Sequence, residues 1–112
     1  MYKYHFRPGY NSMNLLIEFF DGVDKEEFIS DLFKEIESIN PKIIDFKDWW
    51  MNDEILIDVN SSLGDFVVSK DIWGFVFLMA ESNQECVFEI DRLLQKSKQF
   101  ENVKVDYEKY QK

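Results

Sequence analysis

The sequence predicts a single α+β domain: an antiparallel-rich sheet with two helices packed on one face, in the order β-α-β-β-β-β-α-β. Two segments carry apolar residues at helical spacing, and several short segments rich in β-branched and aromatic residues are separated by turn residues. The 112 residues fit one domain, and hydrophobic residues make up 46% of them, enough to build a core. Such a layered arrangement buries the apolar sides of both element types. A ferredoxin-like topology with one inserted hairpin is the nearest alternative.

The N-terminal third is expected to contain an arm, a strand and a helix. Residues 1–12 include a Pro-Gly pair and are predicted to be an irregular arm. Residues 14–20 are mostly apolar and predict a strand. A capping box that starts at Asp24 opens a predicted helix, which ends before Pro41. Phe33 lies within this helix and is expected to be buried.

Residues 43–50 and 54–59 predict two strands joined by a tight turn at Asn52-Asp53. With a two-residue turn, Lys47 faces Asp58 across the hairpin. The side expected in the core carries Ile44, Phe46, Trp50, Ile55, Ile57 and Val59. The other side carries Asp45, Lys47, Trp49, Glu54, Leu56 and Asp58. Asp48 falls on the core side, so a bulge or a buried partner is expected there.

The C-terminal half predicts two more strands, a helix and a last strand. Residues 65–70 form the first strand, and residues 72–80 are nearly all apolar, which indicates a central strand with Phe77 buried. A second capping box opens a helix over 82–98. The last strand is expected around Val103 and Val105, and residues 107–112 are expected to form a tail.

Charge narrows the classes of partner. The net charge is −9, and residues 18–91 hold nineteen acidic side chains against five basic ones. A nucleic-acid backbone or an anionic membrane requires a basic surface, so neither is expected as a partner. A basic protein is electrostatically favoured. The alternative is that the acidity serves only solubility.

The hydropathy, the N-terminus and the cysteine content of the sequence predict the cell compartment. No apolar run approaches the roughly 18 residues of a transmembrane helix, and the N-terminus does not resemble a secretory signal. The single cysteine, Cys86, cannot form an internal disulfide. A cytoplasmic location is therefore expected.

Catalytic and metal-binding patterns are weak. His5 is the single histidine, and Cys86 lies on the apolar stripe of the second helix, where a packed core thiol is expected. The hairpin carboxylates have no calcium-loop spacing, and a solvated acidic edge explains them. We therefore expect no catalytic residue, metal or cofactor, and a protein that is not an enzyme.

The hairpin is the expected partner-binding site. Trp49 and Trp50 are adjacent, so they face opposite sides of the sheet, and one of them is available as a binding anchor unless this chain covers both. The residues predicted to bind a partner are Asp45, Trp49, Glu54, Leu56 and Asp58.

Residues 64–84 (GDFVVSKDIWGFVFLMAESNQ) and 90–110 (IDRLLQKSKQFENVKVDYEKY) resemble small bacterial proteins akin to the acidic immunity proteins of polymorphic and contact-dependent growth-inhibition toxin systems. The resemblance implies a protein that binds its cognate toxin domain, often a nuclease with a basic cleft, and blocks it. It carries over no particular residue. The alternative hypotheses are a small ligand-binding or regulatory module that acts as a homodimer, and an enzyme that uses the acidic hairpin.

Overall fold

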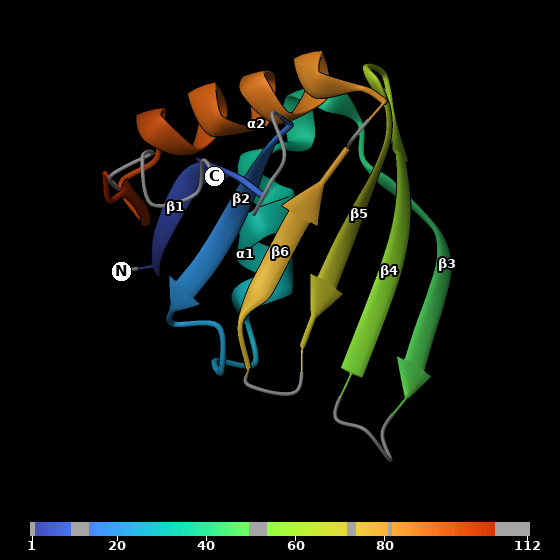
Figure 1. Ribbon diagram of the computed structural model, residues 1–112, viewed down its shortest axis with the longest axis horizontal. Coiled ribbons are helices and arrows are strands. Elements are labelled where there is room, and N and C mark those ends of the chain that lie inside the picture. The colour runs from blue at the N-terminus through green and yellow to red at the C-terminus, as the bar shows by residue number, and fades with distance from the viewer. Residues whose placement is uncertain (1, 10–13, 50–53, 72–73, 81, 105–112) are drawn as a thin grey trace.

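Seven strands form one mixed, mostly antiparallel sheet, and two helices pack on one of its faces (Figure 1). The computed structural model describes residues 2–9, 14–49, 54–71, 74–80 and 82–104. The strands are β1 (Tyr2–Pro8), β2 (Leu15–Asp21), β3 (Lys42–Trp49), β4 (Glu54–Ser61), β5 (Gly64–Lys70), β6 (Val76–Met79) and β7 (Phe100–Asn102). The helices are α1 (Phe28–Glu35), α2 (Gln84–Lys96) and the short 3-10 helix η1 (Glu37–Ile39). The order across the sheet is β3-β4-β5-β6-β2-β1-β7.

The predicted α+β class with both helices on one face is confirmed, but the predicted element order lacks one strand. The predicted irregular arm at residues 1–12 is wrong for residues 2–8, because Tyr2–Pro8 form β1. This strand pairs antiparallel with β2 and parallel with β7. Its side chains alternate between apolar and basic, which is the period of a strand, and Pro8 falls at its end, where a missing N–H costs little.

Both helices exist, but neither predicted capping box forms. The residues at the N-caps, Glu27 and Asn83, make no side-chain capping hydrogen bond. The Asn83 amide donates instead to the backbone oxygen of Leu63 at 2.6 Å. The Gln84 amide oxygen accepts from the backbone N–H of Leu15 at 2.7 Å. These polar side chains therefore attach the start of α2 to the β4–β5 turn and to β2.

The β3–β4 hairpin has the predicted faces in a different register. Trp49 pairs with Glu54, so the connection is residues 50–53 and not a two-residue turn, and Lys47 pairs with Leu56 and not with Asp58. A shift of two residues keeps the described side chains of Asp45, Phe46 and Lys47, and those of β4, on their predicted sides. The expected bulge occurs at Ile44, between the paired residues Ile43 and Asp45, and not at Asp48.

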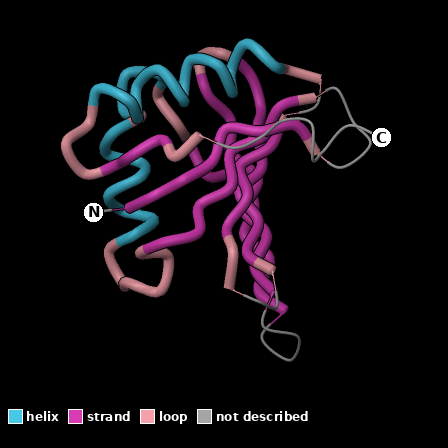
Figure 2. Tube along the Cα trace, turned by 60° about the vertical axis from the view of Figure 1, so that its left-hand side comes forward, coloured by secondary structure: helices cyan, strands magenta, loops and turns pink. Residues whose placement is uncertain are grey.

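The core lies between the helices and one face of the sheet (Figure 2). It includes Tyr4, Ile17, Phe19, Ile57, Val59, Phe66, Val68 and Leu78 from the sheet, with Phe28, Leu32, Val87, Ile90 and Leu94 from the helices. No described helix covers the opposite face, which we call the open face. None of the described helices is long and apolar enough to cross a membrane.

Five apolar residues expected in the core are more exposed than predicted: Phe33, Ile44, Phe46, Ile55 and Phe77. Ile44 is 63% exposed and Phe46 53%, because β3 is an edge strand that extends past the helices. Phe33 is half-buried at the margin of the core, and Phe77 is half-buried on the open face.

The C-terminal elements are partly as predicted. β6 lies between β5 and β2, which confirms it as a central strand. The last strand, Phe100–Asn102, precedes the predicted position. Val103 lies just after this strand and donates its N–H to the Tyr4 oxygen at 2.8 Å. The predictions for Trp50, Asn52-Asp53, Val105 and the tail at 107–112 fall outside the described residues.

Candidate interaction surface

The hairpin brings four of the five predicted partner-binding residues together on the open face: Asp45, Glu54, Leu56 and Asp58. Alternation along β4 buries Ile57 and Val59 against the helices, so Leu56 and Asp58 lie on the opposite side. The pairing of β3 with β4 adds Asp45 to the same side. We call the group Asp45, Glu54, Leu56 and Asp58, with Trp49 at the end of β3, the acidic hairpin surface.

Two carboxylates of this surface face each other. Asp45 pairs directly with Asp58 across adjacent strands. Lys47 is the nearby cation: its Nζ lies 3.7 Å from Asp45 Oδ2, and both side chains are 50% exposed. Like charges directly opposite in a sheet are destabilising, and an exposed ion pair offsets little of that cost. The strand pairing therefore maintains an unfavourable concentration of negative charge on the open face.

The remaining predicted residues lie along the same hairpin. Leu56 is half-buried opposite Lys47, and Glu54 is half-buried opposite Trp49. The side chain of Trp49 lies outside the described residues. Toward the sheet centre, Leu56 and Asp58 are followed by Ser69 and Val67 of β5. An apolar position flanked by carboxylates results, which is the usual arrangement of a protein interface with a polar rim.

Farther along the open face, a buried ion pair links β1 and β2. Arg7 of β1 donates from Nε to Glu18 of β2 at 2.8 Å, and their side chains are only 7% and 15% exposed. The guanidinium also lies 5.8 Å from the ring centroid of Phe77. Arg7 therefore has its charge neutralised within the fold, whereas the acidic hairpin surface does not.

The other chemically interesting residues have structural roles. Asp91 is 6% exposed and accepts hydrogen bonds from Tyr4, Gln95 and Asn102. Cys86 is fully buried, as predicted, and burial raises the pKa of its thiol, although a contact with Ser61 acts in the other direction. Such a thiol is a poor nucleophile.

His5 and the acidic groups show no metal-ligand geometry. The His5 ring stacks on Phe20 with centroids 4.2 Å apart, and its Nδ1 lies 2.8 Å from the Val103 oxygen. Within the described parts of the chain, no three His, Cys, Asp or Glu side chains are grouped closely enough to hold a metal ion.

Sequence reasoning missed two features with functional potential. The first is the exposure of Ile44 and Phe46, which the alternation predicts to lie in the core, because their exposure depends on β3 being the edge of the sheet. The second is Lys70, which the sequence places at the end of a predicted strand without a functional role, although it follows Phe66 and Val68 at strand spacing and so shares their helix-covered face. That alternation was the signal that would have identified it.

Comparison with known proteins adds no assignment: no family model, no curated protein and no solved structure matches this chain.

Proposed function

We propose that this chain is a non-enzymatic binding protein that neutralises a basic toxin domain, such as a nuclease, by direct contact through the acidic hairpin surface. The observation that carries the proposal is the direct opposition of Asp45 and Asp58 on the open face. A cationic partner would relieve this repulsion on binding, so part of the cost is recovered in the complex. An apolar anchor at Leu56 adds burial between the charges.

The negative charge of the acidic hairpin surface favours a basic protein as its partner. A nuclease cleft is basic because it binds phosphates. An acidic protein surface is attracted to the same cleft and competes there with the nucleic acid. Rim carboxylates accelerate association, and a central apolar side chain slows dissociation. Both kinds of residue occur together on the hairpin.

A growth assay tests the proposal in cells. Where a gene beside that of this chain encodes a secreted protein, the chain is co-expressed with the C-terminal domain of that protein. We expect the wild type to restore growth and Asp45→Asn/Asp58→Asn to lose protection. The control Glu26→Gln/Glu27→Gln removes the same charge from exposed positions before α1 and should protect fully. Full protection by the hairpin variant, or none by the wild type, would refute the proposal.

We infer, as a second candidate, a small ligand-binding or regulatory module that acts as a homodimer through the edge of β3. Ile43, Ile44 and Phe46 are 50%, 63% and 53% exposed. β3 is the first strand of the sheet, and among the described residues no strand pairs with its outer side. Long edge strands with exposed apolar side chains favour pairing with another chain.

The charges of β3 fit a two-fold register centred on Phe46. In an antiparallel pair of β3 strands in this register, Asp45 of each copy faces Lys47 of the other, and the two Phe46 rings meet. The bulge at Ile44 lies outside this central segment. Neighbouring registers instead place Asp45 against Asp45 or Lys47 against Lys47, which is unfavourable.

Charge exchange tests this dimer. Asp45→Lys and Lys47→Asp should each be monomeric alone, because each places like charges opposite one another. Mixed in equal amounts, they should form a heterodimer, since every opposed pair is then complementary. Sedimentation velocity measures the result. Monomeric wild type, or a mixture that stays monomeric, would exclude the dimer.

A further inference from the structure

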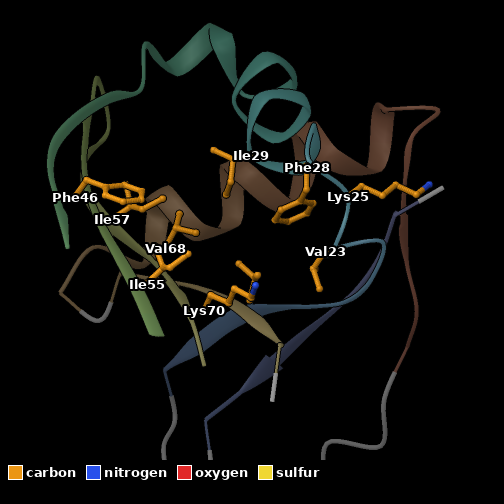
Figure 3. Close-up of a pocket in the computed structure, with 10 residues that line it drawn as sticks. Val23, Lys25, Phe28, Ile29, Phe46, Ile55, Ile57, Val68 and Lys70 are labelled. Atoms are coloured by element: carbon orange, nitrogen blue, oxygen red, sulfur yellow. The ribbon is translucent and has the colours of Figure 1, made fainter. Parts of the chain in front are cut away.

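An apolar pocket opens on the helix-covered side of the sheet, away from the acidic hairpin surface (Figure 3). Its volume is about 190 Å³. Ile29 of α1 lies above it, Ile57 and Val68 of the sheet form its base, and Val23 borders it before α1. Apolar cavities of roughly 150 Å³ accept a single aromatic ring such as benzene, so this one has room for a ring with a short substituent.

The pocket exists because the helix layer is narrower than the sheet. α1 ends at Glu35, and the chain then passes through η1 to the far edge strand β3. α2 lies against β2, β5 and β7. The part of the sheet toward β3 is therefore incompletely covered, and Phe46 borders the pocket with 53% of its surface exposed.

Lys70 gives the pocket its polarity. It is the last residue of β5, half-buried, and alternates onto the same face as the buried Val68. In the described part of the chain its side chain makes no hydrogen bond or ion pair. Figure 3 shows its amino end directed toward the middle of the lining side chains. Lys25 extends outward instead, with Nζ 5.5 Å from the Tyr2 ring centroid.

A half-buried cation beside apolar side chains is stabilised by an anionic partner. Partial burial of an ammonium group is unfavourable unless it is paired. The region 18–91 contains nineteen acidic side chains, yet none of the described ones pairs with Lys70. We infer that the pocket binds a small apolar carboxylate, with its ring or short hydrocarbon chain in the cavity and its carboxylate paired with Lys70.

This site does not rest on the toxin-binding proposal, because it lies on the other side of the sheet. For the second candidate function, the small ligand-binding module, the pocket specifies the ligand class, a small apolar carboxylate. The two proposals can therefore fail separately, and Asp45→Asn/Asp58→Asn should leave carboxylate binding unchanged.

Phenylacetate is a suitable probe, and 2-phenylethanol is its neutral counterpart of similar size. In methyl NMR titrations, phenylacetate should shift the signals of Val23, Ile29 and Val68. Lys70→Met should weaken phenylacetate binding by at least about tenfold, as expected for loss of a charge-assisted hydrogen bond, and leave 2-phenylethanol binding unchanged. Lys70→Arg should retain binding. Lys34→Met removes an exposed lysine of α1 and should have no effect.

A pocket-filling variant supplies the second test. Ile29→Phe should abolish binding of both probes while the thermal melt stays cooperative. If Ile29→Phe does not fold, Val23→Phe is used as the pocket-filling variant instead. The inference is overturned by unshifted methyl signals, by wild-type phenylacetate affinity in Lys70→Met or in the filled pocket, or by equal wild-type affinity for the two probes.

Discussion

The phenol of Tyr4 donates a 2.7 Å hydrogen bond to the carboxylate of Asp91, and this contact joins the first strand to the second helix across 87 positions of the chain. Both residues are buried, and Asn102 of β7 donates to the same carboxylate oxygen at 3.1 Å. The network therefore ties β1, β7 and α2 together. A fully satisfied buried network stabilises one packing arrangement, because any alternative leaves a buried polar group unpaired.

Tyr4→Phe should lower the free energy of unfolding by about 1–3 kcal/mol, since it removes a hydrogen bond to a charged acceptor and keeps the ring. Asp91→Ala should cost more, because it leaves the Tyr4 hydroxyl and the Asn102 amide without their acceptor. Urea denaturation measures both, with Glu85→Ala at an exposed position of α2 as the control. An effect of Asp91→Ala no larger than that of the control would contradict the role of the network.

Alkaline pH should destabilise the fold through two tyrosines. The hydrogen bond to Asp31 and burial raise the pKa of Tyr2 to about 12, and burial with the Asp91 hydrogen bond raises the pKa of Tyr4 further. An unfolded tyrosine titrates near pH 10, so the protonated form is favoured in the folded state and its stabilisation is complete below about pH 10. It is lost as the pH rises toward the folded pKa.

Unfolding free energies measured by urea from pH 9 upward test this sign. The wild type should lose stability steeply above pH 10, and Tyr2→Phe/Tyr4→Phe should show a shallower slope from a lower starting value. Parallel curves would mean that these two phenols do not carry the pH dependence.

Moderate NaCl should raise the melting temperature. The excess of acidic side chains in residues 18–91 produces self-repulsion. At 0.1 M, salt largely screens the repulsion between exposed charges that are more than about 10 Å apart. A variant with exposed acids neutralised, Glu26→Gln/Glu27→Gln/Glu37→Gln, should gain less from the same salt. A melting temperature that is constant or falls with NaCl would be inconsistent with clustered surface acid.

Asp58→Asn should stabilise the protein. It removes the like charge opposite Asp45, and a cross-strand pair of this kind is worth about 0.2–1 kcal/mol. Residues kept for binding commonly lower stability, so a gain here would agree with a functional role for the pair. Urea denaturation of Asp58→Asn and Asp45→Asn measures it. Destabilisation by both substitutions would show that the pair serves the fold.

The periodicity of the sequence was sufficient for the helices and most strands, because amphipathic spacing reflects burial directly. It was misleading in β1, where Pro8-Gly9 outweighed a clear alternation of Tyr2, Tyr4 and Phe6 with basic residues. From Asp45 to Lys47 and along β4, the described side chains lie on the predicted sides, since these depend only on alternation.

Tertiary context determined the rest. The exposure of Phe46 follows from the position of β3 at the sheet edge, which no local pattern encodes. The direct opposition of Asp45 and Asp58 depends on a register set by a four-residue connection. The pocket beside Lys70 depends on the width of the helix layer relative to the sheet.

Binding kinetics test the acidic hairpin surface most directly. The purified chain is immobilised, and the toxin domain that it neutralises in the growth assay is passed over it at several salt concentrations. Asp45→Asn/Asp58→Asn should slow association, Leu56→Ala should accelerate dissociation, and Glu26→Gln/Glu27→Gln should behave as the wild type. Equal loss of association rate in the two double variants, or wild-type kinetics in the hairpin variants, would contradict the assignment of this surface.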